Sequence, residues 1–186
     1  ILFRVLKTPR HGFTSAGAHD AWFAKLSASS PGTATLNGTV TLPGLTAGTA
    51  AYQLKVQVRI FQPGGTTPLT TLETTIDMNG GFSLTGIAPG TYDVEVKEAH
   101  RVGRIARNMS LAAGVTTRSF GDLLAGDTNG DDAVTLADYS RLRASYGKCE
   151  GDPGYQRGGD FTGDGCISLQ DYSRLRANYG TAGPLP

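Results

Sequence analysis

The amino-acid sequence lacks several features that would assign its 186 residues to a familiar class of protein. No apolar run approaches the roughly 18–20 residues that a membrane-spanning helix needs, so we expect no membrane span. The net charge of +1 gives no indication of a nucleic-acid partner. No Gly-x-Ser-x-Gly element or phosphate-binding loop is present, and the three histidines stand in no triad or ligand spacing. We therefore expect a protein that is not an enzyme.

Cysteine is also scarce, with only Cys149 and Cys166 in the chain. An even count permits a disulfide, and this bond would close a loop of about 17 residues, worth up to about 3 kcal/mol through the entropy of the unfolded chain. No Cys-x-x-Cys pair or nearby histidine accompanies the two residues, so a zinc site is not favoured. We predict a disulfide between Cys149 and Cys166.

The first two thirds of the chain have the pattern of short strands separated by turns. Glycine is abundant, with 26 residues, and residues 51–61 alternate between apolar and polar side chains, which is typical of a half-buried strand. Turn residues such as PGG, NGG and APG separate further apolar stretches. We predict seven strands in about 90 residues, forming an antiparallel β-sandwich over residues 33–120. Their expected ranges are 33–42, 51–61, 69–76, 82–84, 91–98, 103–111 and 115–120.

One stretch of the predicted sandwich, GGFSLTGIAPGTYDVEV, contains a Gly-x-Phe element followed by a Pro-Gly-x-Tyr strand. It resembles the carboxypeptidase regulatory-like, transthyretin-like family of small β-sandwiches. The resemblance covers about residues 33–120 and implies a non-catalytic module. Residues 1–32 precede this module as an apolar strand, ILFRVL, and an extended linker.

The last third of the chain is acidic and internally repeated. Residues 1–120 hold 11 Lys/Arg and 6 Asp/Glu, whereas residues 121–186 hold 6 and 10. The decapeptide DYSRLRASYG at 138–147 recurs as DYSRLRANYG at 171–180, with one difference. The repeat predicts a duplicated domain over residues 121–180, followed by a tail at 181–186.

A twelve-residue acidic loop precedes each decapeptide, and its last residue is the first residue of the decapeptide. The two loops are DTNGDDAVTLAD (127–138) and DFTGDGCISLQD (160–171). Oxygen-bearing side chains at positions 1, 3, 5, 9 and 12, with a backbone carbonyl at position 7, are the arrangement that wraps a Ca²⁺ ion. We predict two bound Ca²⁺ ions, with position 9 acting directly or through water. The predicted ligands are Asp127, Asn129, Asp131, the Ala133 carbonyl, Thr135 and Asp138 for the first ion, and Asp160, Thr162, Asp164, the Cys166 carbonyl, Ser168 and Asp171 for the second.

The two loops differ at position 6, where a sharp turn favours glycine. Gly165 provides it in the second loop, whereas the first loop has Asp132, which we expect to adopt a positive φ. Position 8 is Val134 in the first loop and Ile167 in the second. We expect these two residues to pair as a short β-bridge between the loops.

Both loops carry Asp at position 12, and glycine-containing segments precede them where an entering helix would stand. A calcium loop with only an exiting helix, present twice, resembles the type I dockerin family over about residues 126–180. The resemblance implies a pseudo-twofold module that docks onto a β-sandwich partner, a cohesin. In that family, loop positions 10 and 11 and the helix contact the partner. Here those positions are Leu136, Ala137, Leu169 and Gln170, with Arg141, Arg143, Arg174 and Arg176 on the helices.

Two interpretations of the helices stay open at this point. The arginines either form a docking edge, since arginine is favoured at interfaces, or a solvated face. Thr135-x-x-Asp138 and Ser168-x-x-Asp171 fit helix capping boxes as well as metal loops, and the two roles are compatible. Two sets of apolar residues share an arc of their helix and predict a helix–helix seam: Tyr139, Leu142 and Tyr146, and Tyr172, Leu175 and Tyr179.

Together these patterns predict a secreted or cell-surface calcium-binding assembly protein. Because the chain starts at Ile1 with no leader segment, we expect a mature form or a fragment. Its partner is either another copy, joined into a filament by donation of the N-terminal strand, or a separate cohesin-like scaffold. In the alternative interpretation, the chain is the C-terminal anchoring fragment of a secreted enzyme or surface protein. Asn37 and Asn108 lie in N-glycosylation sequons.

Overall fold

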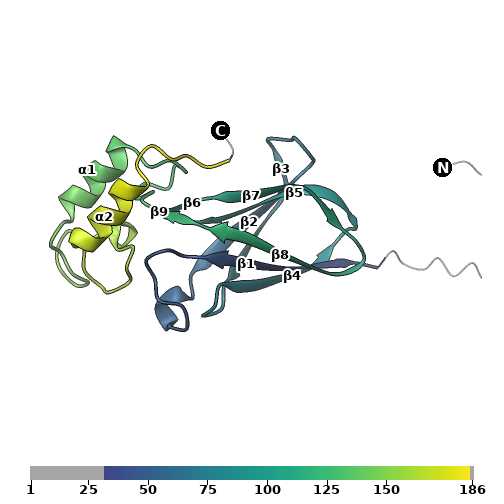
Figure 1. The fold of residues 1–186 in the computed structure, drawn as a ribbon, viewed down its shortest axis with the longest axis horizontal. Helices are drawn as coiled ribbons and strands as arrows, with labels where there is room; N and C mark the ends of the chain where they lie inside the picture. Colours follow the sequence, from purple (N-terminus) through teal and green to yellow (C-terminus); the bar gives the residue numbers. More distant parts are fainter. Residues whose placement is uncertain (1–31, 185–186) are drawn as a thin grey trace, which may run out of the picture.

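The computed structural model describes residues 32–184, and it contains a two-layer β-sandwich with a pair of short helices at one end (Figure 1). The predicted N-terminal strand and its linker up to Pro31 lie outside the described residues. Within these residues, no helix is both long and apolar enough to cross a bilayer.

Seven strands form the two layers of the sandwich, as the sequence pattern predicts. One sheet has three strands in the order β4 (Gly81–Ile87), β1 (Ala34–Thr41) and β8 (Gly114–Asp122). The other has four strands in the order β3 (Pro68–Thr75), β2 (Lys55–Phe61), β5 (Gly90–Glu98) and β7 (Arg104–Leu111). Alternate side chains of both sheets point inward and form one apolar core that includes Leu36, Val58, Val96 and Leu111.

The sandwich is not antiparallel throughout, and this corrects the prediction. Strands β1 and β8 pair in parallel, from Ala34 beside Gly114 to Thr41 beside Asp122. Only a tight hairpin turn forces two strands to run in opposite directions. Strand β7 lies in the four-stranded sheet, and the chain crosses to the other layer before β8 pairs with β1. No hairpin turn joins β1 and β8, so they are free to pair in parallel.

The second predicted strand begins later than its alternation indicates. Residues Ala50–Tyr52 form a short 3-10 turn, and β2 starts at Lys55. Tyr52 is buried, and its hydroxyl oxygen accepts a hydrogen bond from the backbone nitrogen of Leu42 at 2.6 Å. The tyrosine thus closes the loop after β1 instead of extending β2.

The segment that follows the sandwich forms a short antiparallel ribbon. Strand β8 continues to Asp122, and β9 (Leu124–Ala125) pairs antiparallel with β6 (Arg101–Val102). A second apolar core joins this ribbon to both loops and to helices α1 (Leu136–Ala144) and α2 (Leu169–Ala177). A further 3-10 turn covers Arg157–Gly159. The buried members of the second core are Val102, Ala125, Val134, Leu142, Phe161, Ile167 and Leu175.

Arg101 is the main polar connection between the sandwich and the second loop. Its side chain is 2% exposed, and its guanidinium donates to the carbonyls of Pro43, Leu123 and Phe161 at 2.9, 3.2 and 3.1 Å. Burial lowers the pKa of Arg101 from its usual value. Three carbonyls from three separate segments therefore depend on one side chain for their hydrogen bonds.

We predict that Arg101→Met lowers the free energy of unfolding by about 3 kcal/mol, because two buried carbonyls and one partly buried carbonyl lose their donor. Urea denaturation of the two proteins measures this difference. Arg104→Met is the matched control, since Arg104 makes only one bond, to the Asp122 carbonyl, at an exposed position. Equal stability of the Arg101 variant and the wild type would contradict the assigned role.

Candidate metal centre

The first loop is closed by the aspartates at its two ends. Asp127 is completely buried; its Oδ1 accepts a hydrogen bond from the nitrogen of Gly130 at 2.7 Å and its Oδ2 accepts from Asp132 at 2.9 Å. Asp138, in the first turn of α1, accepts from the nitrogens of Asn129 at 3.2 Å and Thr135 at 2.7 Å. The backbone is thereby bent around the side chains of positions 1 and 12.

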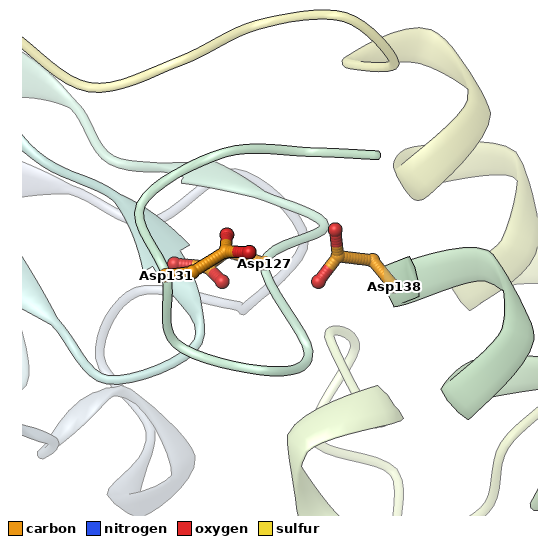
Figure 2. Close-up of side chains that lie close together, drawn as sticks. All are labelled: Asp127, Asp131 and Asp138. Atoms are coloured by element: carbon orange, nitrogen blue, oxygen red, sulfur yellow. The ribbon is translucent and has the colours of Figure 1, made fainter. Parts of the chain in front are cut away.

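Three carboxylates converge inside this loop. Ligand oxygens of Asp127, Asp131 and Asp138 all lie within 4.8 Å of one another. Figure 2 shows Asp138 extending from the start of its helix toward the other two. Like charges at this separation repel one another, and a divalent cation bound by oxygen ligands offsets that repulsion. The donor set therefore fits a hard cation such as Ca²⁺.

The second loop repeats the backbone arrangement position by position. Asp160 accepts from the nitrogens of Gly163 at 2.7 Å and Gly165 at 2.9 Å. Asp171 accepts from the nitrogens of Thr162 at 3.0 Å and Ser168 at 2.9 Å, the same two positions as in the first loop, and also from Phe161 at 2.8 Å. Its carboxylates converge less, since among the described residues only the first loop gathers three of them so closely.

Thr162, at position 3 of the second loop, lies between two predicted ligands. Its hydroxyl oxygen is 3.3 Å from Asp160 Oδ1 and 3.2 Å from Asp171 Oδ1. Tyr155 also donates to Asp160 Oδ2 at 3.1 Å. Burial and the neighbouring Asp160 carboxylate raise the pKa of Tyr155 to about 12, so the phenol remains a donor at neutral pH.

Position 6 has the expected backbone in both loops. Asp132 has a φ of 69° and Gly165 a φ of 85°. An aspartate therefore occupies a left-handed conformation that glycine adopts more easily.

The two loops do not pair directly, which corrects the predicted bridge between Val134 and Ile167. Val134 exchanges hydrogen bonds with Gly180 and Thr181, which follow α2, at 2.9 and 2.8 Å. Ile167 exchanges hydrogen bonds with Gly147 and Lys148, which follow α1, at 2.8 Å each. The segment after each helix already presents free backbone groups beside the other loop, so each repeat is completed by the other.

The disulfide lies at the corresponding bridge of the second loop. Cys149 and Cys166 are joined with their Cα atoms 3.9 Å apart. At the equivalent place in the first loop, Ala133 bridges to Ala182 through the backbone alone. The Cys166 carbonyl, a predicted ligand, therefore belongs to a residue that the disulfide links to Cys149.

Most predicted partner-binding residues lie on an open face. Leu136 is 64% and Leu169 63% exposed, at the starts of α1 and α2. Arg174 differs from the rest because it is half-buried, and its Nε has no hydrogen-bond partner among the described residues. A Cβ on Gly44 would lie 2.9 Å from that atom, so Arg174 faces the sandwich and not an open surface. The other exposed members are Ala137, Arg141, Arg143, Gln170 and Arg176.

The helix seam is shorter than the periodicity predicts. Leu142 and Leu175 are buried, and the rings of Tyr139 and Tyr172 lie 5.9 Å apart. The predicted members Tyr146 and Tyr179, in contrast, are 49% and 55% exposed. The helices end two residues before these tyrosines, so helical spacing no longer determines which way they point.

The residues that connect the first loop to the sandwich were not identified from the sequence. Lys97 Nζ donates to Asp127 Oδ2 at 2.6 Å, to Asp132 Oδ1 at 3.0 Å and to the Arg101 carbonyl at 2.9 Å. Lys97 belongs to β5, about 30 residues before the loop. Its alternation there resembles that of any outward-facing strand residue, so no sequence signal marks it.

No known protein family and no curated protein matches the chain. Two solved structures of type II Cohesin–X–Dockerin complexes from Acetivibrio cellulolyticus are similar to it, one a C-terminal and one an N-terminal interface mutant. Each matched chain is 27% identical, and the match covers 81% of this chain and 97% of that one, with TM-scores of 0.66 and 0.65. The likeness supports a β-sandwich fold of the kind present in cohesin–dockerin complexes.

We predict that the double substitution Cys149→Ser with Cys166→Ser lowers the free energy of unfolding by about 3 kcal/mol, because the unfolded chain regains the entropy of an open loop. Denaturation without reductant measures this effect. Reductant should lower the stability of the wild type to that of the double variant and leave the variant itself unchanged. A wild type that does not respond to reductant would contradict the prediction.

Proposed function

We propose that the chain is a non-catalytic, extracellular docking module that binds two Ca²⁺ ions and presents its helices to a protein partner. The convergence of Asp127, Asp131 and Asp138 within 4.8 Å carries this proposal. The second loop strengthens it, because its end aspartates accept hydrogen bonds from the backbone nitrogens at positions 3, 4, 6 and 9, as those of the first loop do. An ordinary polar surface loop would not be expected to recur with the same hydrogen bonds at matching positions.

The predicted ligands already lie within the two folded loops and would hold the ions there. In the first loop these are the carboxylates of Asp127, Asp131 and Asp138, with Asn129, Thr135 and the Ala133 carbonyl. A bound Ca²⁺ neutralises carboxylates that otherwise repel one another. The aspartate at position 12 of each loop also belongs to a capping box, in which the hydroxyl of Thr135 or Ser168 accepts from the backbone of the first turn and the aspartate accepts from the nitrogen of that capping residue.

The coverage of the structural match supports a dockerin-like assignment for the C-terminal part. The sandwich spans about half of the chain, so a match over 81% extends well into the duplicated loops. The matched complexes are of type II, whereas the sequence pattern resembles type I dockerins. Cohesins of both types are therefore the partners to compare.

The exposed face of the two helices suits such a partner. Leu136 and Leu169 occupy equivalent positions and are exposed to the same extent. Arg141, Arg143 and Arg176 are exposed on the same two helices and give them positive charge. A β-sandwich partner with an apolar patch and acidic residues around it would complement this face.

The alternatives rest on less. An anchoring role at the end of a longer secreted protein fits the same docking face. Filament formation through the N-terminal strand concerns residues outside the described ones and stays a prediction.

The two N-glycosylation sequons differ in their surroundings. The sequon residue Asn108 is exposed on β7, whereas Asn37 lies on the central strand β1 and accepts a hydrogen bond from Ser83 at 2.8 Å.

We predict that the protein binds two Ca²⁺ ions per chain, measured by isothermal titration calorimetry after removal of metal with a chelator. Asp131→Ala and Asp164→Ala should each remove one ion, because each deletes a ligand of a different loop. Leaving both loops without an ion should also lower the melting temperature, since folding and metal binding are linked. Absence of both heat and any thermal shift with Ca²⁺ would refute calcium binding.

We predict that Leu136→Asp combined with Leu169→Asp abolishes binding to the type II cohesin of the matched complexes in the presence of Ca²⁺, because charge replaces the apolar contacts. Surface plasmon resonance against type I and type II cohesins measures this effect. Leu69→Asp is the matched control, since Leu69 is 54% exposed on β3 of the sandwich. If neither cohesin type binds the wild type, the cohesin assignment fails.

A further inference from the structure

Asp132 occupies a backbone conformation that disfavours it. Position 6 of each loop has a positive φ, 69° at Asp132 and 85° at Gly165. Glycine adopts this conformation freely, whereas any side chain is strained there. If the turn were the only requirement, glycine would serve better in the first loop, as it does in the second.

The side chain of Asp132 makes contacts that glycine could not make. Its Oδ1 accepts hydrogen bonds from the backbone nitrogen of Gly103 at 2.7 Å and from Lys97 Nζ at 3.0 Å. Both donors belong to the sandwich: Gly103 stands between β6 and β7, and Lys97 is on β5. The strained residue therefore bonds the first loop to the sandwich through its side chain.

Lys97 extends this connection to the metal site itself. Its ammonium has three donors, and they find the Arg101 carbonyl, Asp132 Oδ1 and Asp127 Oδ2. Asp127, at position 1, is completely buried. The sandwich thus supplies one cation that holds positions 1 and 6 of the first loop at the same time.

The tail covers the other side of Asp132. The nitrogen of Gly183 donates to the Asp132 carbonyl at 2.7 Å. A Cβ on Gly183 would collide with Asp132 Oδ2, so only glycine permits this close approach. The side chain therefore lies between the sandwich and the tail.

The second loop has no equivalent of this arrangement. A Cβ built on Gly165 meets no atom within 4 Å, so a side chain at this position would not pack against the sandwich at its Cβ. Arg101 reaches that loop through the Phe161 carbonyl at position 2. The sandwich thus bonds to the side chains of positions 1 and 6 in the first loop and to one backbone carbonyl in the second.

We propose that Asp132 is a positioning residue, which with Lys97 makes the calcium affinity of the first loop depend on their contacts with the sandwich, whereas the affinity of the second loop does not depend on these contacts. The proposal rests on the calcium binding proposed above. A loop whose position 1 carboxylate is already held in place loses less conformational entropy when it binds an ion. Residues that orient metal ligands from outside the coordination sphere typically change affinity by about 10–100-fold when they are removed.

The test is Asp132→Gly in the full chain, titrated with Ca²⁺ and followed by NMR. The amides of Gly130 and Gly163 report on the two loops separately, because each donates to the position 1 aspartate of its own loop. We expect the affinity of the first loop to fall about tenfold and that of the second to stay unchanged. The fall is expected even though glycine relieves the strained backbone.

Two further variants separate positioning from general stability. Asp132→Asn keeps an oxygen acceptor for Gly103 and should lose less affinity than Asp132→Gly. Gly165→Asp places the same side chain in the second loop, where the Cβ meets no atom within 4 Å. This variant should lower the calcium affinity of the second loop alone. Without metal, the Gly103 amide should exchange with deuterium faster in Asp132→Gly than in the wild type, because its acceptor is gone.

Three results would overturn the proposal. If Asp132→Gly binds Ca²⁺ in the first loop as tightly as the wild type or more tightly, Asp132 is only a tolerated departure from glycine. If both loops weaken equally, the residue acts on overall stability and not on one site. If the wild type binds no Ca²⁺ in either loop, the proposed function falls and this inference falls with it; the first two results leave the proposed function intact.

Discussion

The closeness of three carboxylates in one twelve-residue loop is the constraint on which the rest of the C-terminal structure depends. Negative charges held within 4.8 Å of one another favour an open loop unless something offsets them. Backbone nitrogens of the loop supply part of the compensation, and Lys97 supplies a full positive charge from the sandwich. Helix α1 starts at Leu136, directly after the Thr135 cap, and its first turn contains Asp138, whose carboxylate is one of the three that are compensated. Loop, cap and helix are therefore one electrostatic unit.

Two such units share a core that neither has alone. Val134 and Ile167 both point into it, yet each is hydrogen-bonded by the segment that follows the other unit's helix. The duplication is therefore interlocked, and loss of one unit would leave the other without an edge to pair with. The sandwich breaks the symmetry of the pair, since it takes Arg174 against its own surface while Arg141 stays exposed.

The sequence predicts the features that depend on neighbouring residues. Periods of two and of 3.6 identify the strands and helices, and loop spacing predicts the turn at Asp132 with its positive φ. Contacts between distant segments could not be predicted in this way. The parallel pairing of β1 with β8, the crossed pairing of the loops and the reach of Lys97 all depend on how separate elements meet. Tyr146 shows the same limit locally, because helical spacing was applied beyond the end of the helix.

The parallel pairing of β1 and β8 determines how the molecule would transmit force. Strand β1 begins at Ala34, at the end of the sandwich away from the helices, and β8 leaves at Asp122 toward them (Figure 1). A pull between residues preceding Gly32 and a partner held at α1 and α2 would run along both strands. Their hydrogen bonds, spread from Ala34 to Thr41, would then be loaded together in shear and not opened one after another.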